Sequence, residues 1–152
     1  MASDFEFRRI VDGDDPTFDA MLDVFSDAFD DAVRYSDKRP GKEYRRNLLS
    51  RDTFVALAAM VDGTIAGALV AYELIKFEQE CSEFYIFDLA VAECHRRKGV
   101  AVGLISALKE IAAKRGGYVI YVQADYGDEP AIALYSKLGR REDVMHFDIA
   151  VD

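Results

Sequence analysis

The sequence contains no tryptophan, only two cysteines, two histidines and three prolines, and no long apolar run. Its longest apolar run, Phe54–Val61, is far too short to span a membrane. Cys81 and Cys94 form neither a metal-ligand pattern nor a disulfide framework, so we expect no metal and a reducing compartment. The opening residues lack the apolar core of a signal peptide. These absences favour a soluble cytoplasmic protein.

Basic residues are also scarce relative to acidic ones. The 152 residues include 19 Lys+Arg and 28 Asp+Glu, so the formal net charge is 19 − 28 = −9. Such a balance argues against general nucleic-acid binding and against docking on anionic lipid, and it suits a cationic substrate. Hydrophobic residues make up 51% of the chain, which excludes a disordered chain, and the length favours a single domain over residues 1–152.

Hydrophobic periodicity predicts a mixed α/β domain with one central sheet and helices on both faces. Asp62-Gly63 lies between two apolar runs and predicts a hairpin. A strand, a helix and a strand in succession over 83–124 predict a right-handed parallel crossover, and 30–42 is predicted as a polar loop. The predicted strands lie at Phe5–Ile10, Thr53–Val61, Thr64–Phe77, Glu83–Val91, Tyr118–Ala124 and Val144–Val151, and the helices at Asp15–Phe29, Tyr44–Leu49, Ala101–Ala112 and Glu129–Leu138.

A basic island stands out in this acidic chain, between a predicted strand and the start of a helix. It reads His95-Arg96-Arg97-Lys98, followed by small residues at Gly99, Ala101 and Gly103. Free amides at a helix N-terminus bind phosphate groups, and small residues let the oxygens approach them. There is no Walker pattern and no Gly-x-Gly-x-x-Gly. From composition alone, a solvated basic turn is an equally good interpretation.

Arg96-x-x-Gly99-x-Ala101 resembles the acyl-CoA pyrophosphate motif of the GCN5-related N-acetyltransferase superfamily. The preceding Asp88–Val91 strand, the Ala131–Gly139 helix and the order of elements are similar to that superfamily too. The resemblance implies the acyl-CoA N-acyltransferase fold and acetyl-CoA (CoA) as cosubstrate. The CoA-binding residues that it implies are Leu89, Ala90, Val91, Arg96, Arg97, Lys98, Gly99, Val100, Ala101, Val102, Asp128, Ala131 and Tyr135.

A narrower resemblance covers most of the chain, from about Phe25 to Asp148. Ile86–Val91, Tyr118–Asp128 and Val144–Asp148 are similar to the type I aminoglycoside (gentamicin) 3-N-acetyltransferases. Asp128 stands where the superfamily often has Asn, but that subgroup also carries Asp there. Arg140 departs from the superfamily's aromatic residue. The resemblance implies acetylation of the 3-amino group of aminoglycosides, antibiotic resistance and a homodimer.

Acetyl transfer to an amine needs a group that takes a proton from the ammonium. We predict that Asp88 is this base, since strand alternation places its carboxylate on an apolar face with Phe84, Ile86 and Ala90, and the resemblance agrees. Glu83, which begins the same strand, is a second candidate. Tyr135 is the predicted acid for the CoA thiolate, because the superfamily has a tyrosine at this position of the helix.

A polyamine sugar would be held by several carboxylates, each worth little alone. The predicted substrate-binding residues, beside the catalytic candidates, lie in loops after a helix and after a strand. They are Asp30, Asp31, Tyr35, Glu83, Asp88, Asp125, Tyr126 and Glu129. His146 and Asp148 are two residues apart and are expected to pair without any role in substrate binding.

Other functions remain open on this evidence. The same fold could acetylate a polyamine, a peptide N-terminus or a protein lysine, because acidity suits any cationic acceptor. A non-catalytic CoA-binding sensor is a further alternative, which the presence of Asp88 and Tyr135 disfavours. Cys94 and His95 could suggest a ping-pong mechanism, but adjacent residues rarely align as nucleophile and base.

Overall fold

A computed structural model describes residues 4–152 as two compact units. The first extends to Val122 and the second spans Gln123–Asp152. Each unit is built differently: the first holds the whole described sheet, whereas the second holds one helix and extended chain.

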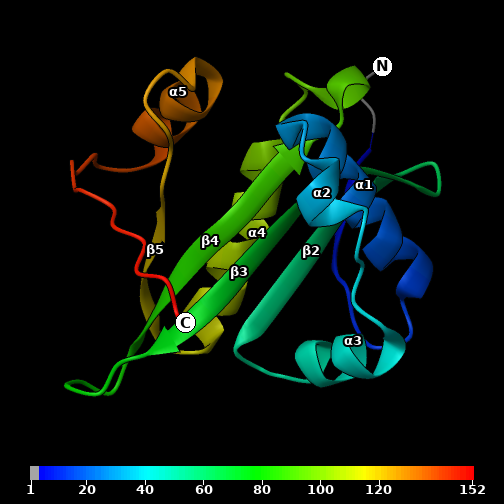
Figure 1. The fold of residues 1–152 in the computed structure, drawn as a ribbon. Coiled ribbons are helices and arrows are strands. Elements are labelled where there is room, and N and C mark those ends of the chain that lie inside the picture. Colours follow the sequence, from blue (N-terminus) through cyan, green and yellow to red (C-terminus); the bar gives the residue numbers. More distant parts are fainter. Residues whose placement is uncertain (1–3) are drawn as a thin grey trace. The chain divides into compact units, whose positions relative to one another are not determined.

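The first unit contains a five-stranded sheet in the order β1-β2-β3-β4-β5 (Figure 1). Its strands are β1 (Glu6–Arg9), β2 (Phe54–Val61), β3 (Thr64–Ile75), β4 (Ser82–Val91) and β5 (Gly117–Val122). Neighbouring strands are antiparallel except for β4 and β5, which run parallel. The first five predicted strands, and the parallel crossover, are therefore confirmed.

The β2–β3 hairpin turns at the predicted Asp62-Gly63 pair. Asp62 has φ 49° and Gly63 has φ 76°. Two successive residues with positive φ form the turn whose twist matches that of the two strands, and Asp-Gly tolerates it. The conformational preferences of these two residues therefore account for the hairpin turn.

One face of the sheet is covered by α1 (Asp15–Phe29). The helix buries Phe18, Met21 and Phe25, which are part of the predicted apolar stripe, in a core with Ala56 and Ala58 of β2. The apolar side of α1 and the alternate residues of β2 that face it thus form one apolar layer. We call this side of the sheet the α1 face.

Two short helices follow α1, of which the sequence predicted one. The predicted polar loop over 30–42 was wrong in part, because it contains α2 (Ala32–Tyr35). A single turn with one buried residue is too short to show a period in the sequence. The predicted second helix is α3 (Lys42–Leu49), and Arg45 anchors it to α1 through an ion pair with Asp19 at 2.7 Å.

The opposite face of the sheet is covered by α4 (Val100–Lys114), which follows a short 3-10 turn, η1 (Glu93–His95) (Figure 1). Leu104 and Leu108 are fully buried. Gly116 has φ 78° and ends the helix as predicted, directly before β5. Among residues 4–152, no helix combines the length and apolarity that a membrane crossing requires.

The second unit contains α5 (Glu129–Leu138), which begins and ends as predicted. The predicted strand Val144–Val151 was wrong, since the structure assigns no strand to this segment. Its apolar side chains alternate, and Met145, Phe147 and Ile149 are each at least 78% exposed. Alternating apolar side chains can form one apolar side of a strand, but a strand also needs a neighbouring strand to pair with. The second unit contains no other strand.

Candidate active site

A β-bulge in β4 sets the direction of the predicted catalytic carboxylate. Asp88 pairs with Val70 of β3, but the next pair along is Ile86 with Ala71, so Phe87 is the extra residue. The bulge reverses the alternation. Asp88 therefore lies on the α1 face, together with Ala90 and Val70 of the core described above.

The predicted face of Asp88 was therefore wrong in part. Phe84 lies beneath the other face, because a Cβ at Gly117 would approach its ring within 2.9 Å and the Ala112 carbonyl at 3.0 Å. Asp88 shares a side with Ala90 but not with Phe84 or Ile86. Strand alternation cannot anticipate this result, because one inserted residue inverts it.

Asp88 is half-buried, and its carboxylate is held by the short helix α2. The Tyr35 hydroxyl donates a hydrogen bond to Oδ2 of Asp88 at 2.9 Å. Burial raises the pKa of Asp88, while the Tyr35 hydrogen bond and the positive charge of Arg34 oppose the rise. Among residues 4–152, no hydrogen bond reaches the other oxygen, Oδ1. The carboxyl is thus a base of raised pKa with one open oxygen.

An aromatic row continues along the α1 face from Asp88, formed by Tyr72, Phe87, Tyr85 and Tyr121. The Phe87 ring lies edge-on to Tyr72 at 5.8 Å, and Tyr85 stacks on Tyr121 at 4.8 Å. Phe87 is 53% exposed and Tyr72 37%. Large aromatic rings open to solvent offer a flat surface for the apolar face of a sugar or for an ammonium group.

Glu83 lies at the other end of this row, roughly 15 Å along the strand from Asp88. Its Oε1 accepts a hydrogen bond from the Tyr118 hydroxyl at 2.6 Å and lies 3.5 Å from Nζ of Lys76. The carboxylate is therefore already shared between two donors. This environment suits an anchoring carboxylate better than a second base.

The basic turn before α4 has the backbone of an anion site. Gly99 and Arg97 have φ of 82° and 62°, and no side chain caps the helix. Within the described residues, no backbone amide from Arg97 to Val102 donates to a backbone carbonyl. Residues 96–99 are exposed. Unused amides, the helix dipole and adjacent cations together suit a pyrophosphate, so these residues fit the CoA that the sequence implied.

Not every small residue in this turn serves an anion. Gly103, which we expected to keep the amides accessible, instead lets α4 approach β1. A Cβ at Gly103 would lie 2.0 Å from Cζ of Phe7. Gly103 is therefore a packing glycine, whereas nothing lies within 4 Å of a Cβ at Gly99. Arg96 is exposed, and its Nε donates to the Val91 carbonyl at 3.2 Å.

The last residues of β4 have one edge without a strand. Leu89, Ala90 and Val91 pair with β3 on one side. On the other side, pairing with β5 ends at Ile86 and Val122. Among the strands that the structure describes, none covers the second edge from Phe87 onward. An open strand edge can accept a peptide-like ligand through backbone hydrogen bonds, as the amide groups of pantetheine would require.

The second unit contains the predicted acid. Tyr135 lies on α5 and is half-buried, and burial together with the nearby Asp128 carboxylate raises its pKa to about 12. Asp128 caps α5 by accepting from the Ala131 amide at 3.3 Å. Asp125 and Glu129 are exposed, and the Tyr126 hydroxyl donates to Asp143 at 3.3 Å. His146 and Asp148 form the predicted pair, at 2.8 Å.

Two predicted substrate ligands take part in helix ends. Asp30 adopts φ 49° at the C-terminus of α1 and is exposed. Asp31 caps α2, because its side chain accepts from the Arg34 amide at 3.0 Å. Tyr35, predicted as a ligand, donates its hydroxyl to Asp88 instead of presenting it to solvent. The sequence did not indicate the local partners of these three residues, and their role as substrate ligands stays a prediction.

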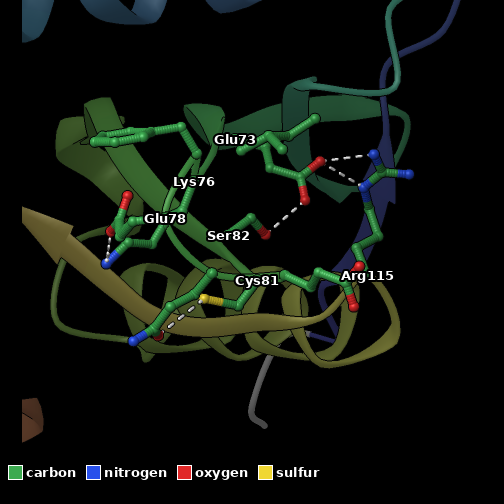
Figure 2. Close-up of a pocket in the computed structure, with 10 residues that line it drawn as sticks. Glu73, Lys76, Glu78, Cys81, Ser82 and Arg115 are labelled. Atoms are coloured by element: carbon green, nitrogen blue, oxygen red, sulfur yellow. Dashed lines mark hydrogen bonds and ion pairs between the residues drawn. The ribbon is translucent and has the colours of Figure 1, made fainter.

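A cavity lies away from Asp88, at the tip of the β3–β4 hairpin. It measures about 530 Å³ and is lined by Glu73, Lys76, Ser82 and Arg115 among others (Figure 2). Glu73 accepts from Ser82 Oγ at 2.7 Å and from Arg115 Nε at 2.8 Å, and its side chain is 2% exposed. The buried carboxylate is fully used in joining the hairpin to the end of α4. Glu73 therefore has no free oxygen for catalysis.

Comparison with known proteins identifies a family. The acetyltransferase (GNAT) family model matches residues 18–139. No curated protein sequence matches the chain. Among solved structures, an aminoglycoside acetyltransferase, HMB0005, from an uncultured soil metagenomic sample is 52% identical. That match covers 98% of this chain and 99% of the other, with a TM-score of 0.95.

Two further structures are more distant. An aminoglycoside acetyltransferase, meta-AAC0020, from an uncultured soil metagenomic sample in complex with sisomicin is 26% identical, over 97% of each chain, with a TM-score of 0.87. An aminoglycoside N-acetyltransferase, AAC(6′)-Iy, in complex with CoA is 17% identical, over 99% of this chain and 98% of that one, with a TM-score of 0.76. At that identity the likeness concerns the fold alone.

Proposed function

The chain belongs to the acetyltransferase (GNAT) family, and from this premise we propose that it transfers the acetyl group of acetyl-CoA to an aminoglycoside. The acceptor in this proposal is the 3-amino group of the 2-deoxystreptamine ring, as in gentamicin, and its acetylation gives antibiotic resistance. The observation that carries the proposal is the half-buried Asp88 carboxylate, which has one oxygen held by Tyr35 and the other open.

Similarity supports the substrate class. The chain is 52% identical to one structure that is an aminoglycoside acetyltransferase and 26% identical to another that holds sisomicin. The choice of the 3-amine rests on the resemblance of Tyr118–Asp128 and Val144–Asp148 to the type I 3-N-acetyltransferases. The acetyltransferase that binds CoA is related too distantly to bear on the position of the amine.

Acetyl-CoA would bind through backbone groups. The free amides between Arg97 and Val102 hold the pyrophosphate, and the exposed Arg97 and Lys98 add positive charge. The uncovered edge of β4 at Leu89 and Val91 receives the pantetheine. When bound, acetyl-CoA supplies an activated thioester.

The chemistry divides between two side chains. Asp88 removes a proton from the acceptor ammonium, directly or through one water, and the neutral amine attacks the thioester carbon. A carbon–nitrogen bond forms, the carbon–sulfur bond breaks, and the nitrogen releases its second proton to water. The leaving thiolate takes a proton from Tyr135, and water returns a proton to the tyrosine. With a pKa of about 12, Tyr135 still carries that proton at neutral pH.

The acceptor surface is matched to a polycationic sugar. The aromatic row joins two carboxylates, Asp88 and Glu83, about 15 Å apart along β4. A multi-ring aminoglycoside can present an amine to each end while its rings lie over Phe87 and Tyr85. Exposed Asp30, in the same compact unit, adds negative charge.

The remaining proposals concern the whole protein. We infer that residues 1–152 act as one domain, supported by a family match that runs through both compact units. We also infer a cytoplasmic homodimer, from the family resemblance and the cysteine usage. Sedimentation velocity would show a mass of twice 17.1 kDa for the dimer and 17.1 kDa for a monomer.

The release of free CoA thiol from acetyl-CoA tests the proposed activity. Purified protein is assayed with gentamicin, with spermidine and with a lysine peptide. We expect turnover with gentamicin only, and NMR of the product should place the acetyl group on the 3-amine. Turnover restricted to spermidine or peptide would retain an acetyltransferase but reject the aminoglycoside. Tight CoA binding without turnover on any amine would indicate the sensor alternative.

A further inference from the structure

Tyr35 is buried, and its hydroxyl is hydrogen-bonded to Asp88 and not available to a substrate. The Tyr35 side chain is 8% exposed, and its hydroxyl donates to Oδ2 of Asp88 at 2.9 Å. The rings of Phe25 and Phe29 both lie 5.8 Å from the Tyr35 ring. The tyrosine therefore has one packed position, and its single donor is directed at the carboxylate.

The helix that carries Tyr35 is fixed at both ends. Asp31 caps its first turn by accepting from the Arg34 amide. Nε of Arg39 donates to the Tyr35 carbonyl at 3.1 Å, and the same guanidinium pairs with Asp19 and Asp23 of α1. A helix of only four residues does not hold its shape alone. These contacts anchor α2 to α1, so the Tyr35 hydroxyl is held in a fixed position.

The charges around Asp88 explain what the hydroxyl can do. Burial and the neighbouring Asp88 carboxylate raise the pKa of Tyr35, so the phenol remains protonated and can only donate to Asp88. Burial raises the pKa of Asp88, and the Tyr35 hydrogen bond opposes it. The other titratable or charged groups that face Asp88 are Arg34 of α2 and Tyr72 of β3.

We propose that Tyr35 is a positioning residue: its hydroxyl holds Oδ2 of Asp88 in the charged form and turns Oδ1 toward the acceptor amine. The inference rests on the proposed function, because it assigns Asp88 as the base. It differs from the expectation that Tyr35 touches the substrate. A ligand would change acceptor affinity, whereas a positioning residue changes the ionisation of Asp88 and the turnover.

Tyr35→Phe removes the hydroxyl and keeps the ring packing. We expect kcat/KM for the aminoglycoside to fall about tenfold at pH 6 and much less at pH 9, because Asp88 loses the donor that favours its charged form. The affinity for CoA should not change. Tyr44→Phe is the matched control, since Tyr44 is 65% exposed and has no hydrogen bond to Asp88; its pH profile should equal that of the parent.

A second measurement does not depend on activity. A 13C NMR titration of the labelled Asp carboxyls, with Asp88→Asn to assign the signal, should give a higher midpoint for Asp88 in Tyr35→Phe. If Tyr35→Phe fails to fold, 3-fluorotyrosine at position 35 should move the midpoint down, because the more acidic hydroxyl donates more strongly. An unmoved midpoint in the folded variant overturns the inference. If the Asp88 midpoint moves but the protein does not turn over any aminoglycoside, the effect of Tyr35 on Asp88 is supported and only the proposed substrate is rejected.

Discussion

Tyr135 is a side chain whose environment keeps its hydroxyl protonated. Burial and the Asp128 carboxylate both disfavour its phenolate, so its pKa is raised to about 12. A raised pKa means that the protonated form persists to higher pH. The proton that the CoA thiolate requires is therefore present at every pH at which the enzyme would be assayed.

Tyr135→Phe should reduce kcat about a hundredfold, because the thiolate then takes its proton from water. The loss should be the same at pH 7, 8, 9 and 10, since the wild-type tyrosine titrates only above this range. Tyr44→Phe again serves as the control with an exposed hydroxyl. A loss that disappears near pH 9 would contradict the assignment, because it would report a group that titrates much lower.

At the residue scale, the sequence indicated candidate residues but not their contacts. Asp88 could be predicted, since a carboxylate within an apolar strand must be paired or used. Its partner could not, because Tyr35 is 53 residues away and only the folded chain brings the two together. Gly103 was misinterpreted for the same reason: its close neighbour, Phe7, belongs to the first strand.

At Gly103, helix α4 lies very close to Phe7 of β1. Among the glycines of residues 4–152, a Cβ added at Gly103 would have the closest neighbouring atom. Gly103 permits this approach, since a Cβ there would overlap the Phe7 ring at 2.0 Å. The backbone itself would favour alanine, which is a better helix former by about 1 kcal/mol. The glycine is therefore retained for packing, and the packing positions the first turn of α4.

Gly103→Ala should destabilise the protein by about 1–3 kcal/mol, because the added methyl forces Phe7 or the helix to move. Thermal or urea unfolding measures the change. Ser106→Ala, at an exposed position of the same helix, should leave the stability nearly unaltered. Adding Phe7→Leu to Gly103→Ala should recover part of the loss. If Gly103→Ala proved as stable as the parent, the close contact would be wrong.

At the element scale, long periodic segments could be predicted and short or partner-dependent ones could not. The apolar stripe of α1 and the Asp62-Gly63 turn can each be recognised from the local sequence alone. The helix α2 is one turn long and depends on Arg39 and Asp31 for its position. Val144–Val151 alternates like a strand, but a strand exists only where another strand pairs with it.

The whole molecule carries a net charge of −9, and its predicted acceptor is a polycation. Their attraction raises the local concentration of the acceptor at low ionic strength and is screened by salt. The basic turn before α4, which is proposed to bind CoA and is called the CoA turn below, carries the opposite charge, with Arg96, Arg97 and Lys98 in sequence. The proposed acceptor and cosubstrate therefore differ in the sign of the charge that each would meet.

The KM for gentamicin should rise several-fold between 50 mM and 500 mM NaCl, since salt weakens the attraction between unlike charges. An aminoglycoside with fewer amines should show a smaller rise, because fewer charges are screened. Initial rates at saturating acetyl-CoA measure both, so that the salt sensitivity of the CoA turn does not enter. A KM for gentamicin that is independent of salt would show that the acidic surface plays no part in binding the acceptor.

The most direct test of the central claim compares wild-type protein with Asp88→Asn in the release of CoA thiol with gentamicin, alongside the affinity of each for CoA. The account predicts that kcat falls by about a hundredfold or more, while the dissociation constant for CoA remains within about twofold, because Asp88 acts on the amine and not on the cosubstrate. Equal turnover by the two proteins would remove Asp88 from the mechanism, and with it the role assigned to Tyr35.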